Sequence, residues 1–270
     1  MGVLNLLVVT GYALTAFLTA RWMINGSRES GRGARPVMLS ITIVAALHAL
    51  SLTLLLSSST PPNLSLGTTV SVVALIIVLL FLITCLRRPL MTLGVLVLPA
   101  AGLASLIGWV FPGPAYTPFV NSISALAHML IACLAYGLLS LAVAQSLLVV
   151  TLEKLIRRRH PAGFLVNLPP METMEDALFQ LIYSGFVLLT ITLISGGIFS
   201  EQLFGRALII NHHVILALLA WLSFAVLVTG RKLFGWRGRT AVNWTLTSFV
   251  LLVLGYFGSR VVLEVILSTQ

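Results

Sequence analysis

The sequence predicts an all-α integral membrane protein, a single bundle of eight transmembrane helices. Hydrophobic residues make up 59% of the 270-residue chain and charged residues only 9%, against about a quarter charged in soluble domains. The mean hydropathy of +1.07 excludes an ordinary water-soluble globule. The apolar residues also gather in runs of about 20, which are long enough to cross the hydrocarbon core as helices.

Eight such runs follow one another, and we interpret residues 1–270 as one polytopic membrane domain. Sustained period-two alternation is absent from the sequence, so membrane-spanning strands are not expected. The fifth run continues into a polar tail, which predicts a helix that protrudes from the bilayer, and the segment "TMED" offers a capping box from Thr173 to Asp176 for the next helix. The expected spans are about 3–20, 37–56, 67–86, 90–110, 122–152, 177–198, 208–229 and 240–267.

The basic residues predict how the chain is oriented in the membrane. Fourteen of the sixteen Lys and Arg residues lie in the connections after spans 1, 3, 5 and 7, which share one side. Because basic loops stay in the cytoplasm, both termini are expected to face outward, toward the periplasm of a bacterium. The same distribution predicts a multi-pass protein of the bacterial inner membrane. Membrane topology also accounts for the net charge of +9, so this charge does not indicate binding to nucleic acid. The sequence contains no DNA- or RNA-binding motif.

Four of the five histidines lie in or near the spans, where ionisable side chains are costly and mark functional sites. His48 is expected near the middle of span 2, His128 toward the outer end of span 5, and His212 and His213 toward the outer end of span 7. A proton or cation pathway would need carboxylates at these depths, and the spans offer almost none. Neutral imidazoles in apolar surroundings suit the axial ligation of haem iron. For each histidine alone, the alternative is a hydrogen bond to a neighbouring helix.

The adjacent pair His212 and His213 presents a choice. The two side chains differ by about 100° around a helix, so one binding site can take only one of them. The face of His213 continues through Ala217 and Ala220, which mildly favours His213 as the inward residue.

Two further features of the sequence each allow two interpretations: the small residues around His128, and Arg260, a cation on the outer side. The residues on the helical face of His128 are mostly small, which either makes room for a planar ligand or lets helices pack closely. Arg260 is a candidate partner for haem propionates. It could instead pair with Glu264 or reach toward lipid headgroups.

Three stretches in the same order resemble the cytochrome c assembly superfamily, in particular its HemX/YpjD-type branch with eight predicted spans. They are "HMLIACLAYGLLSLA" (128–142), "PPMETMEDALFQLIYSGFVLLTITLISG" (169–196) and "LLAWLSFAVLVTGRKLFGWRGRTAVNWTLTSFVLLVLGYFGSR" (218–260). The earlier part of the chain resembles the family only in its span pattern and in "ALHALSL" around His48. Alignment to this branch places His212 where a histidine is expected, so the choice between His212 and His213 stays open.

CcsA- and CcmC-type members of the superfamily handle haem during cytochrome c maturation, beside a Trp-rich periplasmic loop. In place of that loop this sequence has "GGIFSEQLFGRALIINHH", with neither Trp nor Asp. The outer platform that presents haem is therefore missing, which leaves direct transfer of haem to apocytochrome open.

The resemblance implies a haem-binding, haem-handling protein that holds haem b non-covalently. The axial candidates are His128, His212 and His213, with His48 and Arg260 as further cofactor-binding candidates. Other cytochrome c maturation proteins are implied as candidate partners, beside haem and the lipid bilayer. The sequence shows no nucleophile–base pair and no carboxylate dyad, so an enzymatic activity is not expected. The alternatives are an accessory protein of metal-ion transport and a b-type haem electron-transfer protein.

Overall fold

The computed structural model describes residues 2–24, 34–58, 64–87, 90–111, 123–157, 169–198 and 212–258. Within these ranges every regular element is helical, and eight helices are long and apolar enough to cross a membrane. The expected all-α class and the eight spans are thus confirmed. The elements are α1 (Gly2–Ile24), α2 (Ala34–Ser57), α3 (Leu66–Arg87), η2 (Met91–Leu93) with α4 (Gly94–Val110), α5 (Ile123–Arg157), α7 (Met171–Ile198), α9 (His212–Phe234), and α10 (Gly238–Val253) continued by η3 (Leu254–Gly258).

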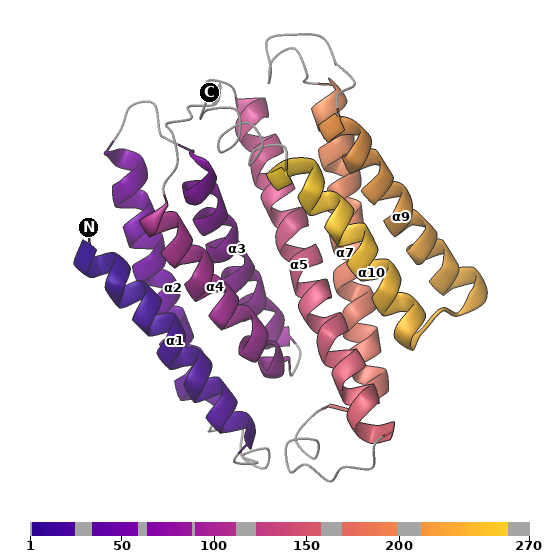
Figure 1. Ribbon diagram of the computed structural model, residues 1–270, viewed down its shortest axis with the longest axis horizontal. Coiled ribbons are helices and arrows are strands. Elements are labelled where there is room, and N and C mark those ends of the chain that lie inside the picture. The colour runs from indigo at the N-terminus through magenta and orange to yellow at the C-terminus, as the bar shows by residue number, and fades with distance from the viewer. Residues whose placement is uncertain are drawn as a thin grey trace. The chain divides into compact units, whose positions relative to one another are not determined.

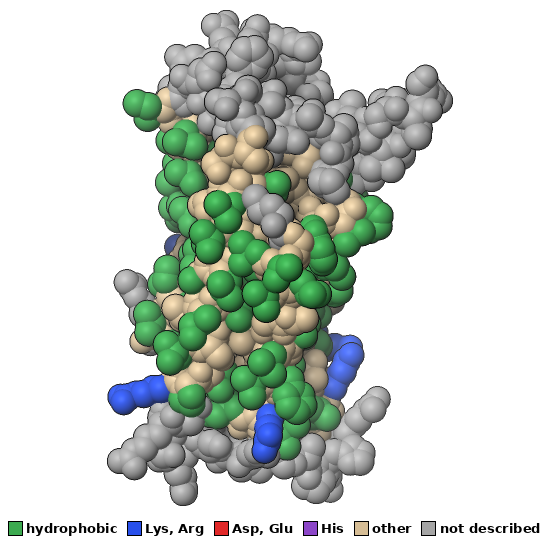
Figure 2. All heavy atoms as spheres, turned by 90° about the vertical axis from the view of Figure 1, so that its left-hand side faces the viewer, with side chains coloured by type: hydrophobic (Ala, Val, Ile, Leu, Met, Phe, Trp, Pro, Cys, Tyr) green, Lys and Arg blue, Asp and Glu red, His purple; other side chains and the backbone are tan. Residues whose placement is uncertain are grey.

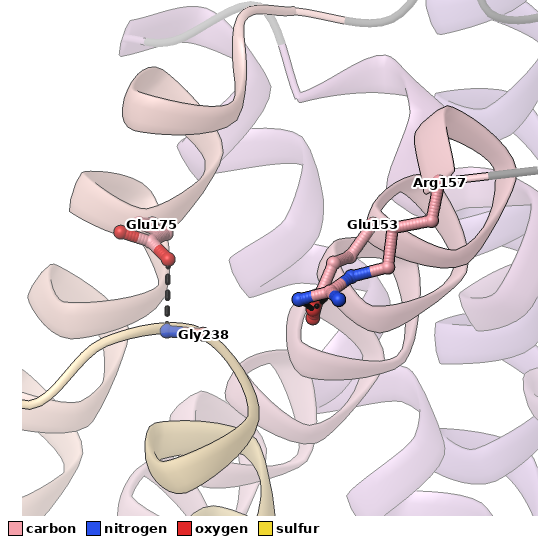
Figure 3. Close-up of polar contacts among 4 residues, drawn as sticks. All are labelled: Glu153, Arg157, Glu175 and Gly238. Atoms are coloured by element: carbon pink, nitrogen blue, oxygen red, sulfur yellow. Dashed lines mark hydrogen bonds and ion pairs between the residues drawn. The ribbon is translucent and has the colours of Figure 1, made fainter. Parts of the chain in front are cut away.

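The predicted extension of the fifth span is confirmed, because α5 is one continuous helix of 35 residues. At about 1.5 Å per residue, such a helix is longer than the roughly 30 Å hydrocarbon core. Its last turns carry an ion pair between Arg157 and Glu153 at 2.8 Å (Figure 3). The two residues are four apart and therefore neighbours on the helix surface, where their pairing supports the polar end of α5.

The start of α7 differs from the expectation. The helix begins at Met171, ahead of the predicted start at 177, so Thr173 lies inside its first turn and the predicted capping box is wrong. The N–H of Met174 donates to the carbonyl of Pro170 at 3.1 Å. Proline suits the beginning of a helix, because its fixed φ is helical and its missing N–H would have no helical partner there. The proline pair at 169–170 therefore sets the start of α7.

The contacts divide the chain into two compact units, which we describe separately. Unit 1 comprises Met1–Pro112 and Thr151–Met174, and unit 2 comprises Gly113–Val150 and Glu175–Gln270. Unit 1 thus contains α1 to α4, and unit 2 contains α9, α10 and most of α5 and α7 (Figure 1). The expectation of a single membrane domain over the whole chain stays a prediction.

Small residues let the helices of unit 1 approach one another closely. A Cβ added to Gly11 of α1 would lie 2.8 Å from a methyl carbon of Val44 in α2. A Cβ added to Gly108 of α4 would lie 2.7 Å from the carbonyl oxygen of Gly67 in α3. Close backbone contact of this kind is how membrane helices associate, since lipid chains are as apolar as the side chains they would replace.

Unit 2 combines close packing with hydrogen bonds between helices. A Cβ on Gly185 of α7 would lie 2.7 Å from a methyl carbon of Leu139 in α5. The buried hydroxyl groups of Ser223 in α9 and Ser248 in α10 are hydrogen-bonded at 2.6 Å. In an apolar environment such polar side chains hold neighbouring helices in register.

The outward faces of the helices carry large apolar side chains. Val3 and Leu86 are each 76% exposed, which suits contact with lipid chains and not with water. In Figure 2, hydrophobic side chains cover the face in view, and most of the visible Lys and Arg side chains lie toward its lower end. The orientation in the membrane, with both termini outward, stays a prediction.

Candidate functional site

The structure places the predicted site residues in two different units. His48 lies on α2 in unit 1. His128 lies on α5, and His212 and His213 begin α9, all in unit 2. Arg260 lies outside the described residues. Each unit therefore has its own histidine environment.

His48 is the centre of a buried hydrogen-bond chain in unit 1. Its side chain is 1% exposed, and its Nδ1 lies 3.0 Å from the hydroxyl oxygen of Tyr12 in α1. Its Nε2 lies 2.9 Å from the Oγ atom of Ser71 in α3. The chain thus ties three helices together. Because both ring nitrogens are engaged, His48 could coordinate a metal only by giving up one of these bonds.

His128 has a hydrogen-bond partner at one of its two ring nitrogens. Its Nδ1 lies 2.8 Å from the Oγ atom of Ser195 in α7. The carbonyl of Thr192 lies 3.1 Å from the same Oγ atom and can take the hydroxyl proton, in which case the Ser195 oxygen accepts from Nδ1. In this tautomer Nδ1 is protonated and Nε2 carries the lone pair. This is the form in which a histidine binds a metal.

Gly196, the next residue of α7, leaves space beside the same imidazole. A Cβ at this position would lie 3.2 Å from the Cε1 atom of His128, closer than ordinary van der Waals contact. The half-buried ring is thus bounded by the Ser195 hydroxyl and by the bare backbone of Gly196.

His213 has the same protonation pattern through a different partner. Its Nδ1 lies 2.6 Å from the carbonyl oxygen of Gly255. A carbonyl only accepts hydrogen bonds, so Nδ1 must be protonated and Nε2 carries the lone pair. Gly255 lies in η3, a π-helical turn, and turns of this kind alter the regular hydrogen-bond ladder and are frequent at functional sites. His212, by contrast, is exposed. The inward member of the pair is therefore His213, as the sequence geometry favoured.

The helices of His128 and His213 both bond to the end of the last span in unit 2. Tyr136 of α5, the helix of His128, donates a hydrogen bond to the carbonyl of Leu252 at 2.9 Å, and His213 bonds to the carbonyl of Gly255. The ring of Tyr256 lies beside His213, with 6.1 Å between the ring centroids. Tyr136 and Phe257 in turn pack against Tyr256, at centroid distances of 6.1 and 5.1 Å. His213 thus adjoins an aromatic cluster, which we define as Tyr136, Tyr256 and Phe257, and Tyr136 lies about two turns from His128 on α5.

Few side chains near these histidines could bind a metal ion. Within the part of the chain that the structure describes, no group of three or more His, Cys, Asp or Glu side chains is arranged to hold a metal ion. A pair of imidazoles matches haem iron, which takes one or two axial ligands from the protein because the porphyrin supplies the others.

Several residues of these sites could not be found from the sequence pattern alone. Ser195 and Gly255 act on the histidines through hydrogen bonds between helices, and neither belongs to a recognisable motif. Tyr12 and Ser71 engage His48 in the same way. The one available signal was the glycine-containing segment "LGYFG" inside the last span, which interrupts the regular helix at 254–258.

Comparison with known proteins decides the family. The sequence matches the profile of the cytochrome C assembly protein family over residues 37–267. The chain belongs to the cytochrome c assembly family. The resemblance inferred from the three C-terminal stretches is thereby confirmed, and it extends to span 2.

Individual relatives from this family cover different shares of the chain. The inner membrane protein YpjD of Escherichia coli K12 is 28% identical over 272 residues, which cover 98% of this chain and 100% of that protein. The cytochrome c biogenesis protein CcsA of Nostoc punctiforme is 33% identical over 87 residues, 32% of this chain and 25% of that protein. The protein HemX of Brevibacillus brevis is 22% identical over 147 residues, 54% of each chain. No solved structure matches.

These comparisons also bear on the predicted location. The full-length relative from Escherichia coli is an inner membrane protein, and this family member has eight helices of membrane-spanning length and composition. Both findings agree with the predicted multi-pass location in the inner membrane.

Proposed function

We propose that this member of the cytochrome c assembly family is a haem-handling protein that binds haem b non-covalently in unit 2. The Nε2 atoms of His128 and His213 are the candidate axial ligands of the iron. The observation that carries the proposal is the pair of Nδ1 hydrogen bonds, to Ser195 and to the Gly255 carbonyl, which engage Nδ1 of both rings and make Nε2 the nitrogen that would face the iron. Family membership supports a role in cytochrome c biogenesis, and the chain is proposed to act without an enzymatic activity of its own.

The residues of the site fit the chemistry of this cofactor. When bound, haem supplies an iron that accepts imidazole nitrogen as an axial ligand. His128 and His213 offer that nitrogen from two helices, α5 and α9. The aromatic cluster beside His213 offers apolar ring surface, of the kind that lines cofactor sites. The other predicted cofactor-binding residues, His48, His212 and Arg260, stay candidates. The geometry of His48 and His212 adds no support, and Arg260 lies outside the described residues.

The visible spectrum of the purified protein tests this proposal. We expect a Soret band in the wild type that is lost in His128→Ala. A colourless wild-type protein that binds divalent cations would support an accessory of metal-ion transport instead. Redox titration then separates haem handling from electron transfer, because an electron-transfer protein requires a haem that cycles reversibly between its oxidation states.

Ser195 should matter for haem binding although it would not touch the iron. In Ser195→Ala, Nδ1 of His128 loses its acceptor, and the ring is no longer held in one orientation or one protonation form. We expect haem affinity to fall by about 10- to 100-fold, the usual effect of losing the partner of a metal-bound histidine. Haem titration of the apoprotein measures this change.

Ser184→Ala is the matched control, because Ser184 lies exposed on the same helix. Equal haem affinity in the Ser195→Ala and Ser184→Ala proteins would contradict the assigned role of Ser195.

A further inference from the structure

The turn between α9 and α10 is built as a rigid element. Helix α9 ends at Phe234, and Gly235 follows with a φ of +66°, a conformation that favours glycine. The N–H of Gly235 donates to the carbonyl of Arg231 at 3.2 Å, and the N–H of Trp236 donates to the carbonyl of Gly230 at 3.3 Å. The first of these bonds is that of an αL motif, which satisfies a carbonyl group at the end of a helix, and the second also engages the carbonyl of Gly230.

The indole ring of Trp236 packs against α9, where the Trp236 N–H bonds to the carbonyl of Gly230. A Cβ at Gly230 would lie only 2.4 Å from a ring carbon of Trp236, so the ring lies directly against the glycine backbone. The ring stacks with Phe234 and with Trp244 of α10, at centroid distances of 6.3 and 5.7 Å. The turn thus carries a fixed stack of three aromatic rings.

Two carboxylates at the start of α7 contact the turn. The Glu175 carboxylate accepts a hydrogen bond from the N–H of Gly238 at 2.9 Å, as Figure 3 shows. Asp176 lies 3.8 Å from Arg231, whose guanidinium also lies 4.4 Å from the centre of the Phe179 ring. Two carboxylates of unit 2 are therefore already engaged with the backbone or with Arg231.

The remaining cations of the turn are accessible to solvent, and the Nζ atom of Lys232 also lies 5.8 Å from the centre of the Tyr183 ring. Lys232, Arg237 and Arg239 are all exposed. Among the described residues, no carboxylate forms an ion pair with any of these three. Leu233 and Phe234, which are 71% and 74% exposed, lie among them. We call these five residues the turn surface.

The turn surface lies at the end of two membrane spans, because the span of α9 ends at Phe234 and the span of α10 begins at Gly238. It is therefore located at the boundary between the apolar core and water. At that boundary, exposed apolar side chains contact the upper part of the lipid chains, aromatic rings lie at headgroup level, and cations meet phosphate.

We propose that the turn surface binds the headgroup of an anionic phospholipid. Its three cations, which form no ion pair with a carboxylate among the described residues, complement the phosphate and the additional negative charge of such a lipid. Leu233 and Phe234 extend the same surface toward the acyl chains, with which a free phosphate ion would make no contact. The stacked rings and the αL motif order the backbone that carries these cations, so little further ordering is needed on binding.

Native mass spectrometry of the full-length protein tests the proposal. The protein is released from micelles that contain equal amounts of phosphatidylglycerol and phosphatidylcholine, and the retained lipids are counted. We expect the wild type to retain phosphatidylglycerol in preference. In Lys232→Gln/Arg237→Gln/Arg239→Gln, we expect this retention to fall by about tenfold or more.

The matched control is Arg21→Gln/Arg35→Gln/Lys154→Gln, which removes the same charge from exposed sites on other helices. This variant should retain phosphatidylglycerol like the wild type, and thermal unfolding in phosphatidylcholine micelles should be equal for all three proteins. Equal lipid loss in both variants, or no loss in the first, would overturn the proposal. Displacement of the lipid by inorganic phosphate would overturn it as well, since it would indicate a small-anion site.

Discussion

The His213→Ala protein is expected to lose its haem, while the neighbouring His212→Ala protein keeps it. His213 points inward and donates through Nδ1 to the Gly255 carbonyl, whereas His212 is exposed at the start of α9. Loss of the hydrogen-bond partner of a metal-bound histidine already lowers metal affinity by about 10- to 100-fold. Loss of the histidine itself should lower haem affinity at least as much. The measurement is the Soret absorbance per protein after purification in mild detergent.

His212→Ala is the matched control, because it removes the same side chain at the adjacent position. A second variant, His213→Gln, keeps a hydrogen-bonding side chain near the Gly255 carbonyl but removes the imidazole, and it should be as free of haem as His213→Ala. Haem loss in His212→Ala with retention in both His213 variants would reverse the assignment. That outcome would favour the alignment of the HemX/YpjD-type branch over the geometry of α9.

Gly108→Ala should strongly destabilise unit 1. A methyl group at this position would lie 2.7 Å from the carbonyl oxygen of Gly67 and 2.9 Å from the Cβ of Ser71. A backbone carbonyl in a helix cannot move aside as the end of a flexible side chain can, so α3 and α4 must separate. Ser71 also bonds to His48, so the buried hydrogen-bond chain would be disturbed as well. We expect a loss of about 1–3 kcal/mol, as for other overpacked interiors, measured by thermal unfolding in detergent.

Gly197→Ala is the control for this substitution. Gly197 lies in the last turn of α7, and an added Cβ would have no neighbour within 4 Å. Alanine favours helix over glycine by up to about 1 kcal/mol, so stability should be equal or slightly higher. If Gly108→Ala unfolded at the same temperature as the wild type, the close contact between α3 and α4 would be wrong.

The membrane fold was predictable because a bilayer constrains sequence strongly. A span needs about 20 apolar residues, whatever its neighbours are, and each of the eight runs became a helix of that kind. Helix ends were less predictable. Thr173 and Asp176 have the right residue types for a capping box, but the proline pair before Met171 starts α7 earlier. The regular part of the last helix ends at Val253, where the π-helical turn begins, a local change that hydropathy does not record.

The sequence predicted which residue types belong to the site, but not which hydrogen bonds their side chains make with other helices. Depth in the spans singled out His48, His128 and the His212/His213 pair, because imidazoles are rare among apolar side chains. Whether a ring nitrogen is free depends on contacts between helices far apart in the chain. Ser71 engages His48, and Ser195 orients His128. Neither serine differs in sequence from others that bond only to their own helix.

The ratio of haem to protein in the full-length chain, extracted in mild detergent from haem-replete cells, is the sharpest test of whether His128 and His213 present Nε2 to haem iron. We expect a b-type haem in near-equimolar amount in the wild type, and none in a His128→Ala/His213→Ala protein that still unfolds cooperatively. A folded wild-type protein without haem, or a double variant that keeps its haem, would contradict the account.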